Sequence, residues 1–248
     1  MSEERAAEIR TFVDDYRRVR LAEGFASTDP EFARRLPFRD TTGRNARAWR
    51  ARAVHYLALR AVLAVLPRVD RVLDVGAGNG WMARRLAGSF RVTALDVDAT
   101  DTGLGAIEDP RVGRLRADLE ALPVAAARVD VAIVAAALHY ALDVTRALGE
   151  LARVLRPGGL LVVADSPVYP DAAARDAAWE RTRDHYRFSG AGHLAARYRG
   201  LVREELDGRA GFRFVELGLR SASPRAWIGR LRGQPVGARF PLLCSRKT

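Results

Sequence analysis

The sequence has 248 residues, is 48% hydrophobic and carries a formal net charge of +11 at pH 7. A chain of this length can bury the core of one globular domain with modest additions, and it is too short for two substantial domains. Its single cysteine, Cys244, excludes an internal disulfide and a zinc site built from several cysteines. Because no set of His, Cys and carboxylate residues has the spacing of metal ligands, we expect no required metal.

The N-terminal segment and the apolar runs bear on location. The first ten residues are polar and lack the apolar stretch of a signal peptide. The longest apolar run, 129–138, is too short to span a bilayer. We therefore expect a cytoplasmic protein with no membrane span.

The positive charge raises the question of a nucleic-acid partner. Lys247 is the only lysine among the 41 basic residues, and the arginines are scattered through every predicted helix. No basic stripe with interleaved aromatic residues stands out, so the charge is typical of solvating arginines. The composition therefore favours a small-molecule substrate over a nucleic acid, and it leaves the oligomeric state open.

Two helices are predicted before any strand, at 2–25 and 44–66, because apolar residues recur in both at helical spacing. A loop that contains Pro30, Pro37 and the turn-like segment 40–43 joins them. We divide the chain into this N-terminal helical cap, 1–66, and a second unit, 67–248.

From residue 67 the pattern changes to short apolar runs that alternate with helical segments. Strands are predicted at 71–75, 91–96, 112–116, 130–136 and 160–164, with helices at 80–87 and 141–155. Buried strands that alternate with helices imply right-handed crossovers, and hence a parallel sheet covered on both faces. The sequence therefore predicts an α/β, Rossmann-like, doubly wound fold.

The C-terminal third is predicted to hold two more helices, 171–187 and 193–206, and two more strands, 212–217 and 239–245. The connection between these strands is long for a hairpin and contains Pro224, Trp227, Gly233 and Pro235. Long connections are often functional, so this one is a candidate for a role at the site.

A glycine-rich loop, Asp74-Val75-Gly76-Ala77-Gly78-Asn79-Gly80, joins the first predicted strand to a helix. Glycines permit a tight turn and a close approach of the backbone to a ligand. Dinucleotide-binding domains use a similar loop, but they direct a helix N-terminus at a pyrophosphate. A carboxylate at Asp74 suits a ligand with an ammonium group better than it suits a phosphate.

Carboxylates also follow the next two predicted strands. Asp96 ends one strand, where it can accept hydrogen bonds from ribose hydroxyls, and Asp118-Leu119 follows the other, where an adenine amino group could donate. A solvated aspartate at a strand end is the alternative interpretation of each residue taken alone. Ligands bind at the carboxyl ends of parallel strands, so three such residues in chain order favour a nucleoside site.

Five segments together resemble the class I S-adenosylmethionine-dependent methyltransferases, in the type 11 branch of ubiquinone- and menaquinone-pathway C-methyltransferases. The segments are VLDVGAGNG (72–80), VTALDVD (92–98), ADLEALP (117–123), DVAIVAAALHY (130–140) and LARVLRPGGLLVVADS (151–166). The resemblance covers about 70–170 and implies a seven-stranded sheet whose last strand is antiparallel. It also implies that residues 1–66 and 170–210 form lid elements over the substrate.

The resemblance assigns S-adenosyl-L-methionine as the cofactor. Gly76, Gly78 and Gly80 would line its methionine portion, Asp96 would bind the ribose, and Asp118 with Leu119 would hold the adenine. The cofactor-binding set that we predict is Asp74, Gly76, Ala77, Gly78, Gly80, Asp96, Val97, Asp118, Leu119 and Ala136.

His139 and Tyr140 follow the fourth strand of the sheet and are the catalytic candidates. Methyl transfer mainly needs in-line positioning, and a general base is required only for a poorly ionised hydroxyl or a carbon acid. The alternative, which we favour for His139, is a packing residue of the cleft wall. His55 is interpreted as structural, and Asp165 with Ser166 as bordering the substrate pocket.

The N-terminal helices carry apolar and aromatic residues that must be buried somewhere. Because the crossover helices already cover the sheet, we expect the first helix and the loop 30–43 to close the crevice at the strand ends. Tyr16 and Phe25 are the predicted acceptor-facing aromatics. The alternative is that these helices pack on the outside of the sheet.

Three other functions stay open. The first is an RNA methyltransferase, although Ala137-Leu138-His139-Tyr140 lacks the Asn/Asp-Pro-Pro-aromatic signature of enzymes that methylate exocyclic base nitrogens. The second is a nicotinamide-dependent oxidoreductase, disfavoured by Asp74 and Asp118. The third is a binding protein that has lost catalysis. The methyl acceptor, and whether oxygen, nitrogen or carbon is methylated, are not determined by the sequence.

Overall fold

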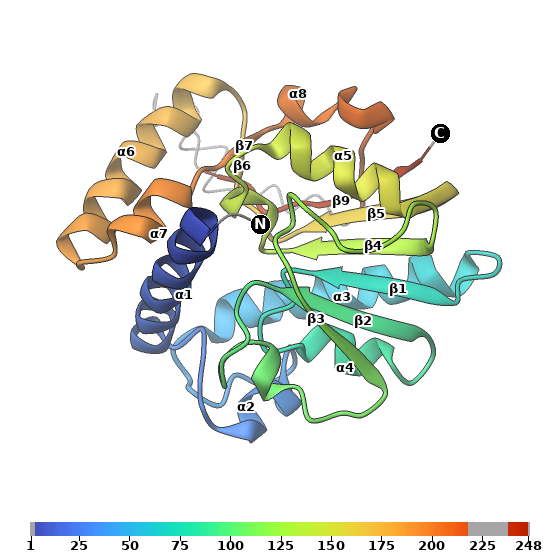
Figure 1. Cartoon of the computed structure of the whole chain (residues 1–248), viewed down its shortest axis with the longest axis horizontal. Helices are drawn as coiled ribbons and strands as arrows, with labels where there is room; N and C mark the ends of the chain where they lie inside the picture. The colour runs from blue at the N-terminus through green and yellow to red at the C-terminus, as the bar shows by residue number, and fades with distance from the viewer. Residues whose placement is uncertain (1–2, 218–237, 248) are drawn as a thin grey trace.

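The computed structural model describes residues 3–217 and 238–247, and its centre is a seven-stranded sheet in the order β3-β2-β1-β4-β5-β9-β8 (Figure 1). The strands are β1 (Arg71–Val75), β2 (Arg91–Asp96), β3 (Val112–Arg116), β4 (Val129–Ala135), β5 (Leu155–Ala164), β8 (Val215–Leu217) and β9 (Leu242–Arg246). The pairs β1–β2, β1–β4, β2–β3 and β4–β5 are parallel, whereas β9 is antiparallel to both β5 and β8. This arrangement confirms the predicted α/β, Rossmann-like sheet with an antiparallel last strand.

Helices cover both faces of the sheet. On one face, α3 (Ala46–Val65) and α4 (Trp81–Leu86) bury side chains such as Trp49 and Trp81 against alternate residues of the strands. On the other face, α5 (Val144–Val154) buries Leu148 and Leu151. Two apolar faces on every central strand explain why these strands have continuous apolar sequences.

Three helices lie together at the carboxyl ends of the parallel strands (Figure 1). They are α1 (Glu3–Glu23), α6 (Ala172–Phe188) and α7 (Gly192–Arg197), and α7 contacts both of the others. Their shared core contains Phe12, Tyr186 and Leu194, and Tyr140 belongs to the same cluster. The helix predicted at 2–25 therefore lies over the strand ends, whereas the helix predicted at 44–66 packs on the face of the sheet.

Several predicted boundaries are wrong. The loop 30–43 contains a short helix, α2 (Pro30–Arg35), which Asp29 caps through a bond from the N–H of Glu31. Helix α5 begins at Val144, behind its cap Asp143, and not at residue 141. The short 3-10 helices are η1 (Leu104–Ala106), η2 (Leu138–Tyr140) and η3 (Arg209–Gly211).

The helix predicted at 193–206 does not exist as one element. Instead, this stretch contains three short elements: α7, strand β7 (Leu201–Val202) and α8 (Arg203–Leu206). Strand β7 pairs with β6 (Val168–Tyr169). A Cβ at Gly200 would lie 2.2 Å from the ring of Tyr169, so this close packing needs glycine at the point where the helix is broken.

The closing strands are shorter than predicted. Residues 212–214 precede β8, because their backbone N–H groups bond side chains: Arg213 donates to Ser245 and Phe214 to Asp207. The long connection with Pro224, Trp227, Gly233 and Pro235 lies outside the described residues. Among the helices of the described part, none is long and apolar enough to cross a membrane.

Candidate functional site

The glycine-rich loop joins β1 to α4 and lies against the end of β2. The backbone N–H groups of Gly76 and Ala77 donate to the carbonyl of Leu95 at 2.7 and 3.1 Å. A Cβ at Gly76 would lie 2.2 Å from the Cβ of Ala137, so packing requires glycine there. Gly78 has a φ of +52°, and its missing Cβ faces open space. Gly78 therefore leaves room beside the backbone for a bound molecule.

Carboxylates at the ends of β2 and β3 line one cleft with this loop. Asp96 Oδ2 accepts a hydrogen bond of 2.8 Å from the N–H of Gly78, and Asp118 lies on the adjacent wall. Burial raises the pKa of Asp96 to about 6, against the opposing hydrogen bonds from the N–H groups of Asp98 and Gly78. Of the predicted cofactor set, Gly76, Gly78, Asp96, Val97, Asp118, Leu119 and Ala136 line this cleft.

The other three predicted cofactor residues, Asp74, Ala77 and Gly80, do not line the cleft. A Cβ at Gly80 would lie 2.4 Å from Ile107, so this glycine serves packing. Asp74 is 2% exposed, and its Oδ2 has no hydrogen-bond partner among the described residues. Burial raises the pKa of Asp74 to about 7, despite a backbone hydrogen bond from Ala83.

Helix α1 forms the opposite wall of the cleft. Phe12, Val13 and Tyr16 line it, and the ring of Tyr16 lies 5.6 Å from that of Tyr140, edge to face. Phe25, the second predicted acceptor-facing aromatic, is not in the lining and packs against the core beside α3. With α1 in this position, the free volume of the cleft is about 70 Å³.

Arginines of α1 and α7 contact carboxylates in and beside the cleft. Arg5 on α1 donates to Asp118 at 2.7 Å and lies 3.8 Å from Glu120. Arg197 on α7 lines the cleft and donates to Glu8 at 3.3 Å. Both arginines lie outside the family motifs, and no sequence signal pairs them with these carboxylates.

The catalytic candidates differ in environment. Tyr140 lines the cleft, and its hydroxyl accepts a hydrogen bond from Arg20 of α1. His139 is 5% exposed and lies within hydrogen-bond distance of Ser166 Oγ, 3.1 Å from Nδ1. Burial, with smaller effects from Arg20 and Arg52, lowers the pKa of His139 to about 3. A sealed imidazole with this pKa is a weak base, which agrees with the packing interpretation of His139.

A second histidine lies near the end of β5. His55 Nδ1, on α3, is 2.8 Å from Oδ1 of Asp165, which directly follows β5. Arg52 precedes His55 by one helical turn and stacks on Trp49, with its guanidinium 4.4 Å from the ring centroid. The sequence, which places His55 on a helix face, had indicated a structural role for it.

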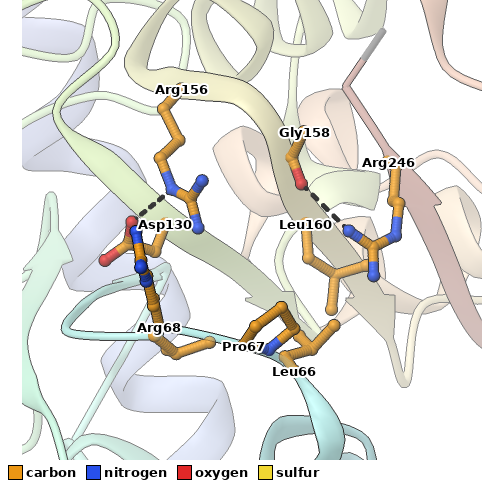
Figure 2. Close-up of a pocket in the computed structure, with 9 residues that line it drawn as sticks. Leu66, Pro67, Arg68, Asp130, Arg156, Gly158, Leu160 and Arg246 are labelled. Carbon is orange, nitrogen blue, oxygen red and sulfur yellow. Dashed lines mark hydrogen bonds and ion pairs between the residues drawn. The ribbon is translucent and has the colours of Figure 1, made fainter.

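A cavity of about 580 Å³ lies at the amino ends of β1, β4 and β5 (Figure 2). Leu66, Pro67 and Leu160 supply apolar walls, and Arg68, Arg156 and Arg246 extend around it. Asp130 in this cavity pairs with Arg156 and accepts backbone hydrogen bonds from Asp70 and Arg71 at 2.9 and 2.8 Å. These contacts fix the start of β1, and Gly78, Asp96 and Asp118 line the other cleft and not this cavity.

Comparison with known proteins shows what the segment that carries most of the cleft is similar to. A model of the methyltransferase domain matches residues 73–163, which include the glycine loop and the ends of β2, β3 and β4. The chain is 37% identical over 123 residues to 27-O-demethylrifamycin SV methyltransferase of Amycolatopsis mediterranei, covering 46% of this chain and 45% of that protein. It is 36% identical over 124 residues to the ubiquinone/menaquinone biosynthesis C-methyltransferase of Syntrophotalea carbinolica, covering 47% and 49%.

The matched segment therefore spans about half the length of these curated relatives. The fold also resembles the geranyl diphosphate C-methyltransferase of Streptomyces coelicolor, solved with Mg²⁺, geranyl diphosphate and S-adenosyl-L-homocysteine. The TM-score is 0.58 at 16% identity, over 80% of each chain. At that identity the likeness concerns the fold alone. The domain match and the curated relatives show that this segment is similar to the class I S-adenosylmethionine-dependent methyltransferases of the type 11 family.

Proposed function

We propose that the protein transfers a methyl group from S-adenosyl-L-methionine to a small-molecule acceptor. The observation that carries the proposal is the single cleft lined by Gly78, Asp96 and Asp118, at the ends of three neighbouring strands. A nucleoside cofactor laid across β3, β2 and β1 would meet Asp118 with its adenine, Asp96 with its ribose and Gly78 with its amino-acid portion.

The residues fit this cofactor chemically. The unpartnered, buried Oδ2 of Asp74 under the loop suits a nearby cation, and Asp96 suits hydroxyl donors. The open space beside Gly78 is a cradle that any side chain would fill. The same carboxylates would repel a pyrophosphate, which supports this cofactor over a nicotinamide dinucleotide.

When bound, the cofactor supplies a methyl group already activated on a cationic sulfur. The chain's own task is then to bind, orient and exclude water, which is where enzymes obtain most of the acceleration of such a displacement. Phe12, Val13 and Tyr16 provide an apolar wall opposite the strand ends. Tyr140 contributes an aromatic edge whose hydroxyl is held by Arg20.

We further propose that α1, with α7 and α6, is a lid that opens for the cofactor. Pockets for such ligands are roughly 300–1,000 Å³, whereas the free volume here is about 70 Å³. The ion pair of Arg5 with Asp118 holds α1 over the place assigned to the adenine. Residues 1–66 therefore act as two parts: α1 as the lid and α3 as a helix of the sheet.

Both named relatives methylate small molecules, which supports a small-molecule acceptor here. Isothermal calorimetry with S-adenosylhomocysteine and with NADH tests the cofactor assignment. We expect saturable binding of S-adenosylhomocysteine and none of NADH. The reverse result would contradict the proposed function and favour an oxidoreductase. A salt-dependent gel shift with RNA would favour the nucleic-acid alternative.

A further inference from the structure

The order of the strands indicates where the methyl acceptor would lie relative to the cofactor. If the cofactor crosses β3, β2 and β1 as proposed, its reactive end points toward the next strands of the sheet, β4 and β5. The acceptor then lies over the ends of these two strands, and this inference rests on the proposed function. The residues that directly follow β4 and β5 are Ala136 and Asp165.

The backbone at both strand ends takes an unusual turn. Ala136 has a φ of +55° and Asp165 a φ of +57°, a conformation that costs free energy for residues other than glycine. The two ends are linked by a hydrogen bond of 2.8 Å from the N–H of Ala136 to the carbonyl of Ala164. Strained residues cluster at functional sites, where the strain orients a side chain.

The strained turn directs Asp165 at a histidine. Its side chain is 7% exposed, and Oδ1 lies 2.8 Å from Nδ1 of His55. An ionised carboxylate can only accept, so it selects the tautomer of His55 that carries the proton on Nδ1. The lone pair of a neutral His55 is then on Nε2.

Nε2 of His55 is the ring nitrogen that Asp165 does not hold. The structure gives it no hydrogen-bond partner among the described residues, and it is not one of their buried unpartnered atoms. The side chain of His55 is 18% exposed. A nitrogen held by a carboxylate on one side and open on the other is the arrangement that a general base requires.

His139 provides a contrast within the same turn. Asp165 holds His55, and the next residue, Ser166, contacts His139. His139 is sealed by Tyr140 and Tyr198, with ring centroids at 4.2 and 5.1 Å. Of these two histidines, His139 is buried, whereas the side chain of His55 is partly exposed.

We propose that His55, positioned by Asp165, is the general base for a hydroxyl acceptor. His55 Nε2 takes the proton as the acceptor oxygen bonds the methyl carbon, and the electron pair of the broken carbon–sulfur bond stays on sulfur. The products are a methyl ether, neutral S-adenosylhomocysteine and a protonated His55, which returns its proton to solvent. Arg52, one turn away on α3, has no ion-pair partner among the described residues and favours an acceptor that gains negative charge.

The first test reads the tautomer and needs no acceptor. Nitrogen-15 NMR of the protein loaded with S-adenosylhomocysteine distinguishes its four histidines through single variants. We expect neutral His55 to carry its proton on Nδ1, and Asp165→Asn to move it toward Nε2. A proton on Nε2 in the wild type, or a tautomer unaffected by Asp165→Asn, would overturn the positioning role.

The second test compares two phenols as acceptors, at a pH where 4-nitrophenol is ionised and catechol is not. His55→Gln should slow transfer to catechol by about 100-fold or more, and transfer to 4-nitrophenol by less than tenfold. It should also remove the loss of rate at acid pH that a neutral base imposes. Arg50→Gln, at an exposed residue of the same helix α3, is the matched control and should leave both rates unchanged.

Equal losses with the two phenols, an unchanged rate with catechol, or no transfer to either phenol would each overturn the base assignment. Calorimetry with S-adenosylhomocysteine separates this failure from that of the proposed function. His55→Gln should bind S-adenosylhomocysteine as the wild type does, so absent binding in the wild type itself would contradict the proposed function instead.

Discussion

Arg5 Nη2 on the first helix lies 2.7 Å from Oδ2 of Asp118, which follows the third strand. The side chain of Asp118 is 9% exposed, so the carboxylate assigned to the adenine is already engaged by the protein's own guanidinium. Burial would lower the pKa of Arg5, but Asp118 and Glu8 more than offset this effect and raise it. Binding of an adenine at Asp118 must therefore displace this ion pair or rearrange it.

Replacing Arg5 tests that competition. Arg5→Gln should speed the association of S-adenosylhomocysteine and tighten its binding by about three- to tenfold, because a partly exposed charged pair no longer has to break. Stopped-flow fluorescence and calorimetry measure both quantities. Arg10→Gln, an exposed arginine of the same helix, is the control and should change neither. Weaker binding in Arg5→Gln would mean that Arg5 closes over the cofactor and does not compete with it.

The two glycines of the loop should behave differently. Gly78→Val should abolish binding of S-adenosylhomocysteine and leave the protein folded, because the new side chain enters open space beside the cleft, at a strained φ. Gly76→Ala should instead lower the melting temperature, because its Cβ would collide with Ala137. Circular dichroism and calorimetry separate the two effects. If folded Gly78→Val binds S-adenosylhomocysteine normally, the loop is only a structural turn and does not bind the cofactor.

Asp96 should be the strongest single contributor to ribose binding. Asp96→Ala removes a charged acceptor for two hydroxyls, and hydrogen bonds to charged groups are worth about 1.5–3 kcal/mol each. We therefore expect at least a tenfold loss of affinity for S-adenosylhomocysteine. The variant also loses the bond to the Gly78 N–H, so thermal melting must be recorded beside calorimetry. Unchanged affinity would remove Asp96 from the site.

Asp74 should make stability depend on pH. Burial raises its pKa in the folded protein to about 7, so the folded state keeps a proton that the unfolded chain releases near pH 4. The stability that this proton provides is present below about pH 4 and is lost as pH rises through about 7, at up to about 1.4 kcal/mol per pH unit.

Asp74→Asn should remove this slope and exceed the wild type in stability above pH 7. Urea unfolding at a series of pH values measures it, with exposed Asp14→Asn as the control. The contributions of Asp96 and His139 to the pH dependence are common to the variants and the wild type and must be subtracted. Asp96, whose pKa is also raised, lowers stability as pH rises. His139, whose pKa is lowered, reduces stability as pH falls below about 6.5. An equal slope in Asp74→Asn and wild type would contradict the raised pKa.

The cleft proposed for the cofactor could be predicted from the sequence because it is built from local patterns. Apolar runs separated by helices specify parallel strands, and the carboxyl ends of such strands meet at one edge. Gly78, Asp96 and Asp118 therefore had to be neighbours although they are far apart in the chain, and they do line one cleft. The glycine pattern did not reveal that Gly76 and Gly80 serve packing, because that depends on Ala137 and Ile107.

Other features were decided only by the tertiary structure. The helix predicted at 193–206 is interrupted after Arg197, and residue 200 must be glycine there because the ring of Tyr169 leaves no space for a Cβ. The contacts of Arg5 with Asp118 and of His55 with Asp165 join residues 113 and 110 positions apart. No periodicity relates such partners, because long side chains meet according to how α1 and α3 dock on the sheet. The strand pattern thus determined where a cofactor could bind, whereas the docking of the N-terminal helices decided which side chains face it.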